Sequence, residues 1–186
     1  MTLEYRASSP DLEVRTDART VVGIAVPFGE VAHVRNNSGG EYRERFVKGA
    51  FRKTIEQRGA KRVKFLAMHD YQRLPLGRAD VLREDENGLY AEFRVSKTTA
   101  GDEVLELIKD GALDALSVGF APVSSRNGKD GALERSEVAL KEVSAVSSGA
   151  YPGATIVAVR SDGSLLRPPF DIEAARRRLH LLTLEG

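Results

Sequence analysis

The sequence feature that most restricts the fold is a hairpin signal in the middle of the chain. Residues 77–83 and 89–95 are two strand-like runs, and Asn87-Gly88 lies in the turn between them. Asn-Gly favours the tight turns that join antiparallel strands. In the second run apolar and polar side chains alternate, so one face of that strand can be buried. The chain is therefore expected to contain an antiparallel strand pair with one face directed into a core.

Further short runs that are rich in β-branched or apolar residues place this hairpin in a larger sheet. Segment 99–110 instead carries apolar residues at helical spacing, and Gly111 after it is a typical helix terminator. Strands and helices do not alternate regularly, so an antiparallel barrel or sandwich with appended helices fits better than a doubly wound sheet. The other strands are expected at 20–28, 41–47, 63–68, 115–123, 133–146 and 155–159, with a short helix through Arg58 and another at 171–182.

Composition limits the chemistry that is open to this chain. Its 186 residues are 41% hydrophobic and suit one globular domain, and a formal net charge of +1 creates no global field for nucleic acid or membrane. The lack of cysteine excludes disulfides, zinc-thiolate sites and thiol catalysis. There is no leader-like N-terminus, and no apolar run approaches the roughly 20 residues that span a bilayer. We therefore expect a soluble intracellular protein without metal, cofactor, nucleic acid or membrane.

A side-chain nucleophile in this chain must be a serine or threonine, and only three histidines can activate one. Ser117 lies in Ala-Leu-Ser-Val-Gly-Phe, and His69 follows the apolar run Phe-Leu-Ala-Met. A histidine at the end of a buried strand is held rigidly while its ring can face a cleft, which suits a general base. Each residue also has a structural interpretation, because small serines permit close packing and histidines are often half-buried. His33, in a polar loop, and His180, in a basic tail, are interpreted as surface residues.

Glu142 is the candidate to orient the histidine. Simple alternation along its strand places it on one face with Leu140, Ser144 and Val146. A carboxylate on a buried face needs a partner, and the edge of a histidine would serve. A solvated strand glutamate is the alternative interpretation, and Asp70 and Asp114 compete for the same role.

Three short segments together resemble, in order, the motifs of the caudovirus prohead proteases. The ordered set is far more specific than any single motif, and it spans about residues 20 to 160. The matching segments are Met68-His69-Asp70 with Leu76-Gly77-Arg78 for the histidine motif, Ala115-Leu116-Ser117-Val118-Gly119-Phe120 for the serine motif, and Leu140-Lys141-Glu142-Val143-Ser144 followed by Ala150-Tyr151-Pro152 for the third.

That family is related in fold to the herpesvirus assembly proteases, so the resemblance implies a β-rich α+β fold with a closed antiparallel β-barrel surrounded by helices. It implies a serine endopeptidase that acts without a cofactor inside the assembling prohead, in the cytoplasm of the bacterial host. The implied partners are the major capsid protein and its scaffold segment, with the portal protein, self-cleavage and a homodimer left open. The expected parts are an N-terminal arm at 1–18, a protease domain at 19–160 and a tail with a helix at 161–186.

The resemblance also assigns roles to residues. Ser117 would attack the peptide carbonyl, His69 would take its proton, and Glu142 would orient His69 where the herpesvirus enzymes use a second histidine. The oxyanion positions fall on Gly149 and Ala150, without the arginines of the herpesvirus enzymes. A non-enzymatic assembly protein on the same barrel is the alternative. An esterase of another fold fits less well, because no Gly-x-Ser-x-Gly sequence surrounds Ser117.

Overall fold

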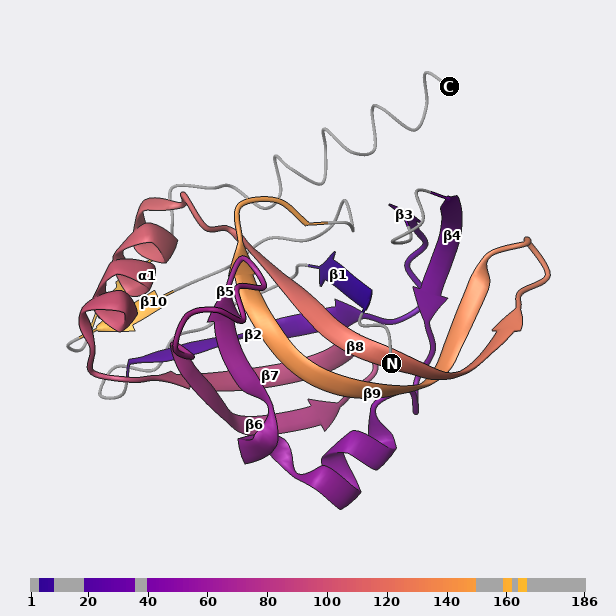
Figure 1. Cartoon of the computed structure of the whole chain (residues 1–186), viewed down its shortest axis with the longest axis horizontal. Coiled ribbons are helices and arrows are strands. Elements are labelled where there is room, and N and C mark those ends of the chain that lie inside the picture. Colours follow the sequence, from indigo (N-terminus) through magenta and orange to yellow (C-terminus); the bar gives the residue numbers. More distant parts are fainter. Residues whose placement is uncertain (1–3, 9–18, 36–39, 150–158, 162–163, 167–186) are drawn as a thin grey trace.

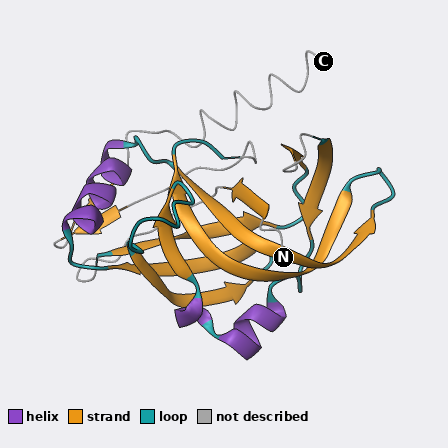
Figure 2. Ribbon diagram, viewed as in Figure 1, coloured by secondary structure: helices purple, strands orange, loops and turns teal. Residues whose placement is uncertain are grey.

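A strongly curved, mixed β-sheet forms most of the structure, and helical elements lie at its margins (Figures 1 and 2). The computed structural model describes residues 4–8, 19–35, 40–149, 159–161 and 164–166. The strands are β1 (Glu4–Ser8), β2 (Thr20–Pro27), β3 (Ala32–Arg35), β4 (Glu41–Phe46), β5 (Lys64–Ala67), β6 (Gly77–Glu84), β7 (Gly88–Val95), β8 (Ala115–Asn127), β9 (Leu133–Val146), β10 (Val159–Ser161) and β11 (Ser164–Leu166). The helical elements are α1 (Thr99–Asp110), the π-helical turn η1 (Thr54–Arg58) and the 3-10 turn η2 (Ala60–Arg62).

The sheet is not closed, so the predicted closed antiparallel barrel surrounded by helices is wrong. The hydrogen-bonded order runs β1, β8, β9, β5, β6, β7, β2, β10, β11, and among the described residues no ladder joins its two ends. A barrel closes only when the outermost strands pair. Here β10 takes the free edge of β2, with Val159 in register with Val21, while β1 pairs with β8. The sheet is also mixed, because β4 and β5 both run parallel to β9.

The local elements with the strongest sequence signals are confirmed. β6 and β7 form the expected hairpin, and the carboxylate of Asp85 closes the turn by accepting the N–H of Gly88 at 3.1 Å. Helix α1 begins after Thr98, whose hydroxyl accepts the N–H of Gly101, and it ends at Gly111, where φ is 81°. A left-handed residue at this position favours glycine, which has no Cβ to clash.

Weaker signals were less informative. The predicted loop around His33 is instead the strand β3, which pairs with β4, and β8 extends four residues beyond its expected end at residue 123. The helix expected at 171–182 and most of the strand expected at 155–159 lie outside the described residues. In the described part of the chain, no helix has the length and apolarity to cross a membrane.

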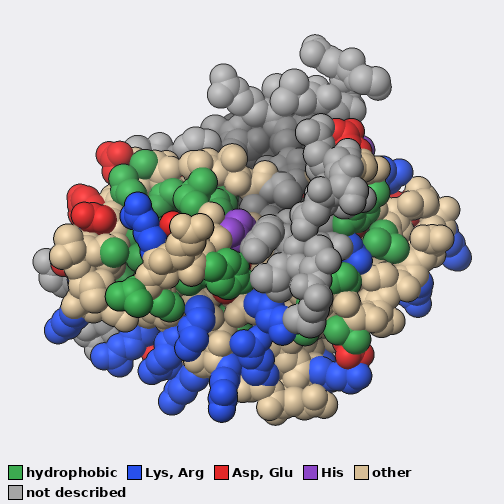
Figure 3. All heavy atoms as spheres, viewed as in Figure 1, with side chains coloured by type: hydrophobic (Ala, Val, Ile, Leu, Met, Phe, Trp, Pro, Cys, Tyr) green, Lys and Arg blue, Asp and Glu red, His purple; other side chains and the backbone are tan. Residues whose placement is uncertain are grey.

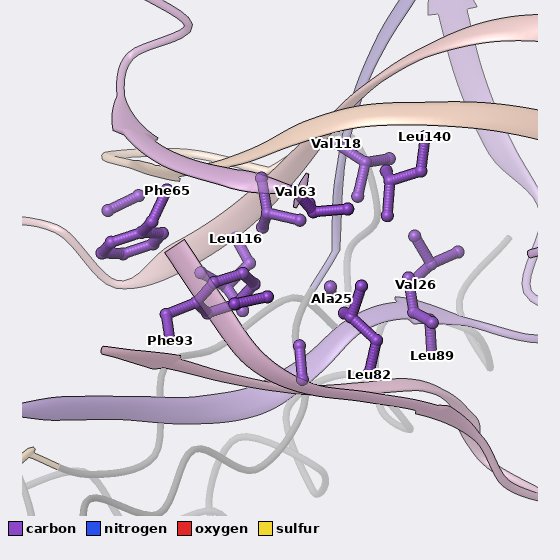
Figure 4. Close-up of a cluster of buried hydrophobic side chains, with 14 of the residues drawn as sticks. Ala25, Val26, Val63, Phe65, Leu82, Leu89, Phe93, Leu116, Val118 and Leu140 are labelled. Atoms are coloured by element: carbon purple, nitrogen blue, oxygen red, sulfur yellow. The ribbon is translucent and has the colours of Figure 1, made fainter. Parts of the chain in front are cut away.

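The curved sheet wraps around one apolar core. Figure 4 shows side chains of β2, β6 and β7 meeting those of β5, β8 and β9 in this core. Phe65 stacks on Phe93 with ring centroids 4.8 Å apart, and Phe46 meets Phe120 edge-on at 5.2 Å. Such aromatic contacts add to the stabilisation that area burial provides.

The opposite surface of the central strands carries the polar residues of interest. The residues on either side of Ser117 on β8 and of Ser144 on β9 are buried in the core. Because successive side chains of a strand point to opposite faces, Ser117 and Ser144 lie on the surface of the sheet that faces away from the core. This surface of the sheet is called the outer face below.

Candidate active site

Ser117, His69 and Glu142 form a continuous hydrogen-bonded chain on the outer face. His69 Nε2 lies 2.6 Å from Ser117 Oγ, and His69 Nδ1 lies 2.7 Å from Glu142 Oε1. Ser117 is on β8, Glu142 is on β9, and His69 follows β5. These strands are neighbours in the sheet, with β9 in the middle. The sheet order therefore brings together three residues that are remote in sequence.

A β-bulge decides which face Glu142 occupies. Gly119 of β8 pairs with Glu142, but the next residue, Phe120, pairs with Leu140. Lys141 is therefore an extra residue in β9, and the alternation of side chains is reset there. Leu140 is buried in the core with Phe120, whereas Glu142 bonds to the histidine on the outer face. The prediction that Glu142 shares a face with Leu140 is wrong for this reason.

The backbone that carries His69 is held in an uncommon conformation. Met68 has φ of 52° and His69 has φ of 57°, both in the left-handed region. This region costs roughly 1–2 kcal/mol for each residue that is not glycine, and such strain persists where surrounding contacts enforce it. Here the Met68 N–H donates to the Ala145 carbonyl at 3.0 Å, and the His69 N–H donates to Ser144 Oγ at 3.1 Å. These bonds turn the imidazole back over the sheet.

Ser144 is a site residue that the sequence reasoning missed. Its hydroxyl donates to Glu142 Oε2 at 2.7 Å and accepts the backbone N–H of His69. Ser144 and Glu142 are both 0% exposed, so neither relies on water for these bonds. Alternation along the strand did place Ser144 on the face of Glu142, but it assigned Ser144 no role.

Burial and polarity suit an activated serine. Ser117 is 3% exposed, whereas the His69 side chain is 19% exposed and is the accessible member of the three hydrogen-bonded residues. A buried carboxylate needs polar partners, and the two oxygens of Glu142 face His69 Nδ1 and the Ser144 hydroxyl. Since a carboxylate accepts, the His69 proton belongs on Nδ1, which leaves Nε2 free to accept a proton from Ser117. The arrangement is chemically competent for nucleophilic attack by serine.

The competing candidates lie elsewhere. Asp70 accepts the Gln72 N–H at 2.8 Å and pairs with Arg73 at 3.4 Å, so its carboxylate is directed to its own loop. Asp114 precedes β8, and burial raises its pKa. His33 is exposed on β3.

The proposed oxyanion donors are only partly covered by the structure. Gly149 is exposed beyond the end of β9, while Ala150 lies outside the described residues. His180, which was expected at the surface, also lies outside them. The oxyanion assignment therefore stays a prediction. Among the described residues, no three His, Asp or Glu side chains form a group that could hold a metal ion.

An apolar hollow adjoins the hydrogen-bonded chain. It has a volume of about 540 Å³ and lies between the segment after β5 and helix α1. Its lining includes Met68, directly before His69, and Leu74, and these side chains belong to residues that are 57% and 89% exposed. Exposed apolar side chains around a hollow are typical of a binding surface.

Comparison with known proteins identifies a family and a similar solved structure. The family model described as caudovirus prohead serine protease matches residues 4–166, a range that contains Ser117, His69 and Glu142. The solved structure of the bacteriophage T4 capsid assembly protease, gp21, is similar with a TM-score of 0.53 and 14% identity, over 78% of this chain and 96% of that chain. At this identity the likeness concerns the fold alone. No curated protein sequence matches the chain.

Proposed function

Since the chain belongs to the caudovirus prohead serine protease family, we propose that it is a maturation endopeptidase with Ser117 as its nucleophile. The observation that carries this proposal is the unbroken chain of hydrogen bonds from Ser117 through His69 to Glu142, at 2.6 and 2.7 Å. A serine, an imidazole and a carboxylate in this order form the working part of serine peptidases on several unrelated folds.

The mechanism follows from the positions of the protons. Ser117 Oγ attacks the peptide carbonyl while His69 Nε2 accepts the hydroxyl proton. His69 then donates this proton to the departing amine as the carbon–nitrogen bond breaks, which leaves an acyl-enzyme. Water, deprotonated by the same nitrogen, hydrolyses the ester and restores Ser117. Glu142 stabilises the imidazolium that forms in both steps, and Ser144 holds the second oxygen of Glu142 in place.

The proposed substrates are the major capsid protein and its scaffold segment, cleaved inside the assembling prohead in the bacterial host. Three observations support this choice. The family is described by its prohead location, and the similar T4 structure is a capsid assembly protease. The apolar hollow beside His69 offers a place for an apolar side chain of an extended polypeptide.

The test is co-expression of the full chain with its capsid protein, followed by intact-mass spectrometry of the capsid protein. The wild type should shorten the capsid protein at a defined position, and Ser117→Ala should leave it at full length. Ser124→Ala is the matched control, because Ser124 is an exposed serine on the same strand, and it should process normally. Processing by Ser117→Ala that equals the wild type would refute the proposal, provided that thermal melting shows both proteins folded.

A further inference from the structure

A row of three cations crosses the outer face of the sheet. Lys64 on β5 is in register with Arg78 on β6, and Arg78 is in register with Arg94 on β7. Neighbours of each along its strand are buried in the core, so the three side chains point to the outer face. Figure 3 shows Lys and Arg side chains gathered on the part of the surface where Figure 1 places β5 and β6. Lys64, Arg78 and Arg94 are called the cation row below.

The cation row is continuous with the candidate active site. Lys64 is in register with Glu142 on β9, which is in register with Gly119, two positions beyond Ser117 on β8. Neighbouring strands lie about 4.8 Å apart, so the three steps from Glu142 to Arg94 span about 14 Å. An extended polypeptide covers that distance with roughly four residues. A substrate segment that crosses the sheet from Ser117 would therefore pass over all three cations.

The charges of the row are only partly balanced within the described structure. Like charges directly opposite each other on neighbouring strands are destabilising. Arg78 donates to Asp80 on its own strand, but none of the ion pairs among the described residues includes Lys64 or Arg94, which are both exposed. Since the formal net charge of the whole chain is only +1, this excess of positive charge is a local feature of the outer face.

The row also lines a hollow that could receive a ligand. This hollow has a volume of about 430 Å³, and Leu74 and Pro75 line it together with the three cations. Leu74 is 89% exposed and also lines the apolar hollow beside His69, so the two hollows share one rim. Cations with neighbouring apolar residues suit an aliphatic side chain that ends in a carboxylate.

We propose that the cation row binds an acidic segment of the substrate polypeptide, with Asp or Glu side chains within about six residues of the cleaved bond. This inference rests on the proposed function, because the polypeptide reaches the row from Ser117. An acidic polypeptide fits the cation row better than a nucleic acid does. The row is short, and it continues directly into the residues that would cleave a peptide bond.

The binding test uses the full chain with Ser117→Ala, so that no cleavage interferes. Fluorescence anisotropy with a fluorescein-labelled hexaglutamate peptide measures the affinity, and labelled hexaglutamine is the neutral comparison. Lys64→Gln with Arg94→Gln should weaken hexaglutamate binding about tenfold, since two charge-assisted contacts are lost. Lys48→Gln with Lys129→Gln is the matched control, because it removes two exposed cations elsewhere and the same net charge. Its affinity should equal that of the parent protein.

Two outcomes of the binding test would overturn the proposal. One is equal affinity of the row variant and the control variant for hexaglutamate. The other is tighter, row-dependent binding of a labelled uridine hexamer than of hexaglutamate, which would assign the row to nucleic acid. Binding should also weaken at high salt, because exposed charges are screened.

The cleavage test places the acidic segment relative to the cut. Wild-type protein is incubated with a tryptic peptide mixture, and mass spectrometry locates the cleavages that Ser117→Ala does not make. Asp and Glu should be enriched on one side of these cuts, and the row variant should lose that enrichment. Unchanged enrichment in the row variant contradicts the proposal. If wild type makes no Ser117-dependent cuts in this mixture or in the capsid protein, the proposed function fails, whereas the binding test still decides what the row recognises.

Discussion

Replacing Glu142 with Gln tests the hydrogen-bonded chain most directly. The substitution keeps the size of the side chain and removes one charge from a fully buried position. In the wild type, each carboxylate oxygen faces one donor: His69 Nδ1–H at 2.7 Å and the Ser144 hydroxyl at 2.7 Å. An amide has a single oxygen, so Gln can satisfy only one of the two donors in this geometry.

Both orientations of the Gln amide lower turnover. If its NH₂ group faces His69, it donates to Nδ1 and forces the imidazole proton onto Nε2, where the proton of Ser117 must be received. If its oxygen faces His69, the imidazolium loses the negative charge that stabilises it, and Ser144 loses its acceptor. In trypsin-like enzymes of a different fold, the equivalent carboxylate-to-amide change costs about 10⁴-fold in turnover. We expect a loss of about 10³- to 10⁴-fold in kcat here, or about 4–5.5 kcal/mol in the barrier.

The assay is steady-state kinetics on a peptide that brackets the cut found in the capsid protein, with circular dichroism to compare the folds. Glu137→Gln is the matched control: Glu137 lies on the same strand, but its carboxylate pairs with Lys53 at 2.8 Å, remote from the hydrogen-bonded chain. It should retain the kcat of the wild type. A folded Glu142→Gln protein with kcat within about threefold of wild type would refute the reasoning, because that change corresponds to only about 0.7 kcal/mol. Turnover would then not depend on a negative charge beside His69 Nδ1.

Three further outcomes are expected. Ser144→Ala should lower kcat about 10- to 100-fold with KM unchanged, because two hydrogen bonds that position Glu142 and His69 are lost. Ser144→Thr should restore part of the lost kcat. Equal kcat for Ser144→Ala and wild type contradicts this positioning role. Burial raises the pKa of Asp114, so the folded protein binds this proton more readily than the unfolded chain does, and the associated stability is present in acid and lost as pH rises through the folded pKa. Asp114→Asn should therefore be more stable than wild type at neutral pH and lose this advantage in acid. Urea unfolding at neutral and at acidic pH measures the difference, and midpoints that differ equally at the two pH values contradict the prediction. Thr98→Ala should destabilise the protein by about 1 kcal/mol and lower Tm by about 2–4 °C, because the N-cap bond to Gly101 is lost, and an unchanged melting curve contradicts this.

Local elements were predictable where the chemistry is local. Asn87-Gly88 marks a hairpin, and β6 and β7 do form one, although Gly88 already belongs to β7 and the turn closes between Asp85 and Gly88. The periodicity of 99–110, with Gly111 after it, likewise specifies α1 without reference to the rest of the fold. In contrast, β3 and its pairing with β4 have a short and polar sequence that carries no such signal.

The candidate site was predictable in its members but not in its geometry. Ser117, His69 and Glu142 could be chosen because few residues in this chain can activate a hydroxyl and because three motifs occur in order. The period of two correctly places Ser144 on the face of Glu142, but it fails between Glu142 and Leu140, since one extra residue at Lys141 resets the alternation there. The left-handed backbone at His69 was also beyond sequence reasoning, because it is enforced by bonds to a strand that lies far away in the chain.

The sequence by itself determined which chemistry is available: no thiol, a few histidines, and strands whose apolar faces must be buried. It did not determine strand partners or direction, because alternation specifies a face and not a neighbour. Only the tertiary structure placed β9 between β5 and β8, left the sheet open, and aligned Lys64, Arg78 and Arg94 beside the candidate active site. These features depend on long-range backbone hydrogen bonds, and no local segment of the chain encodes them alone.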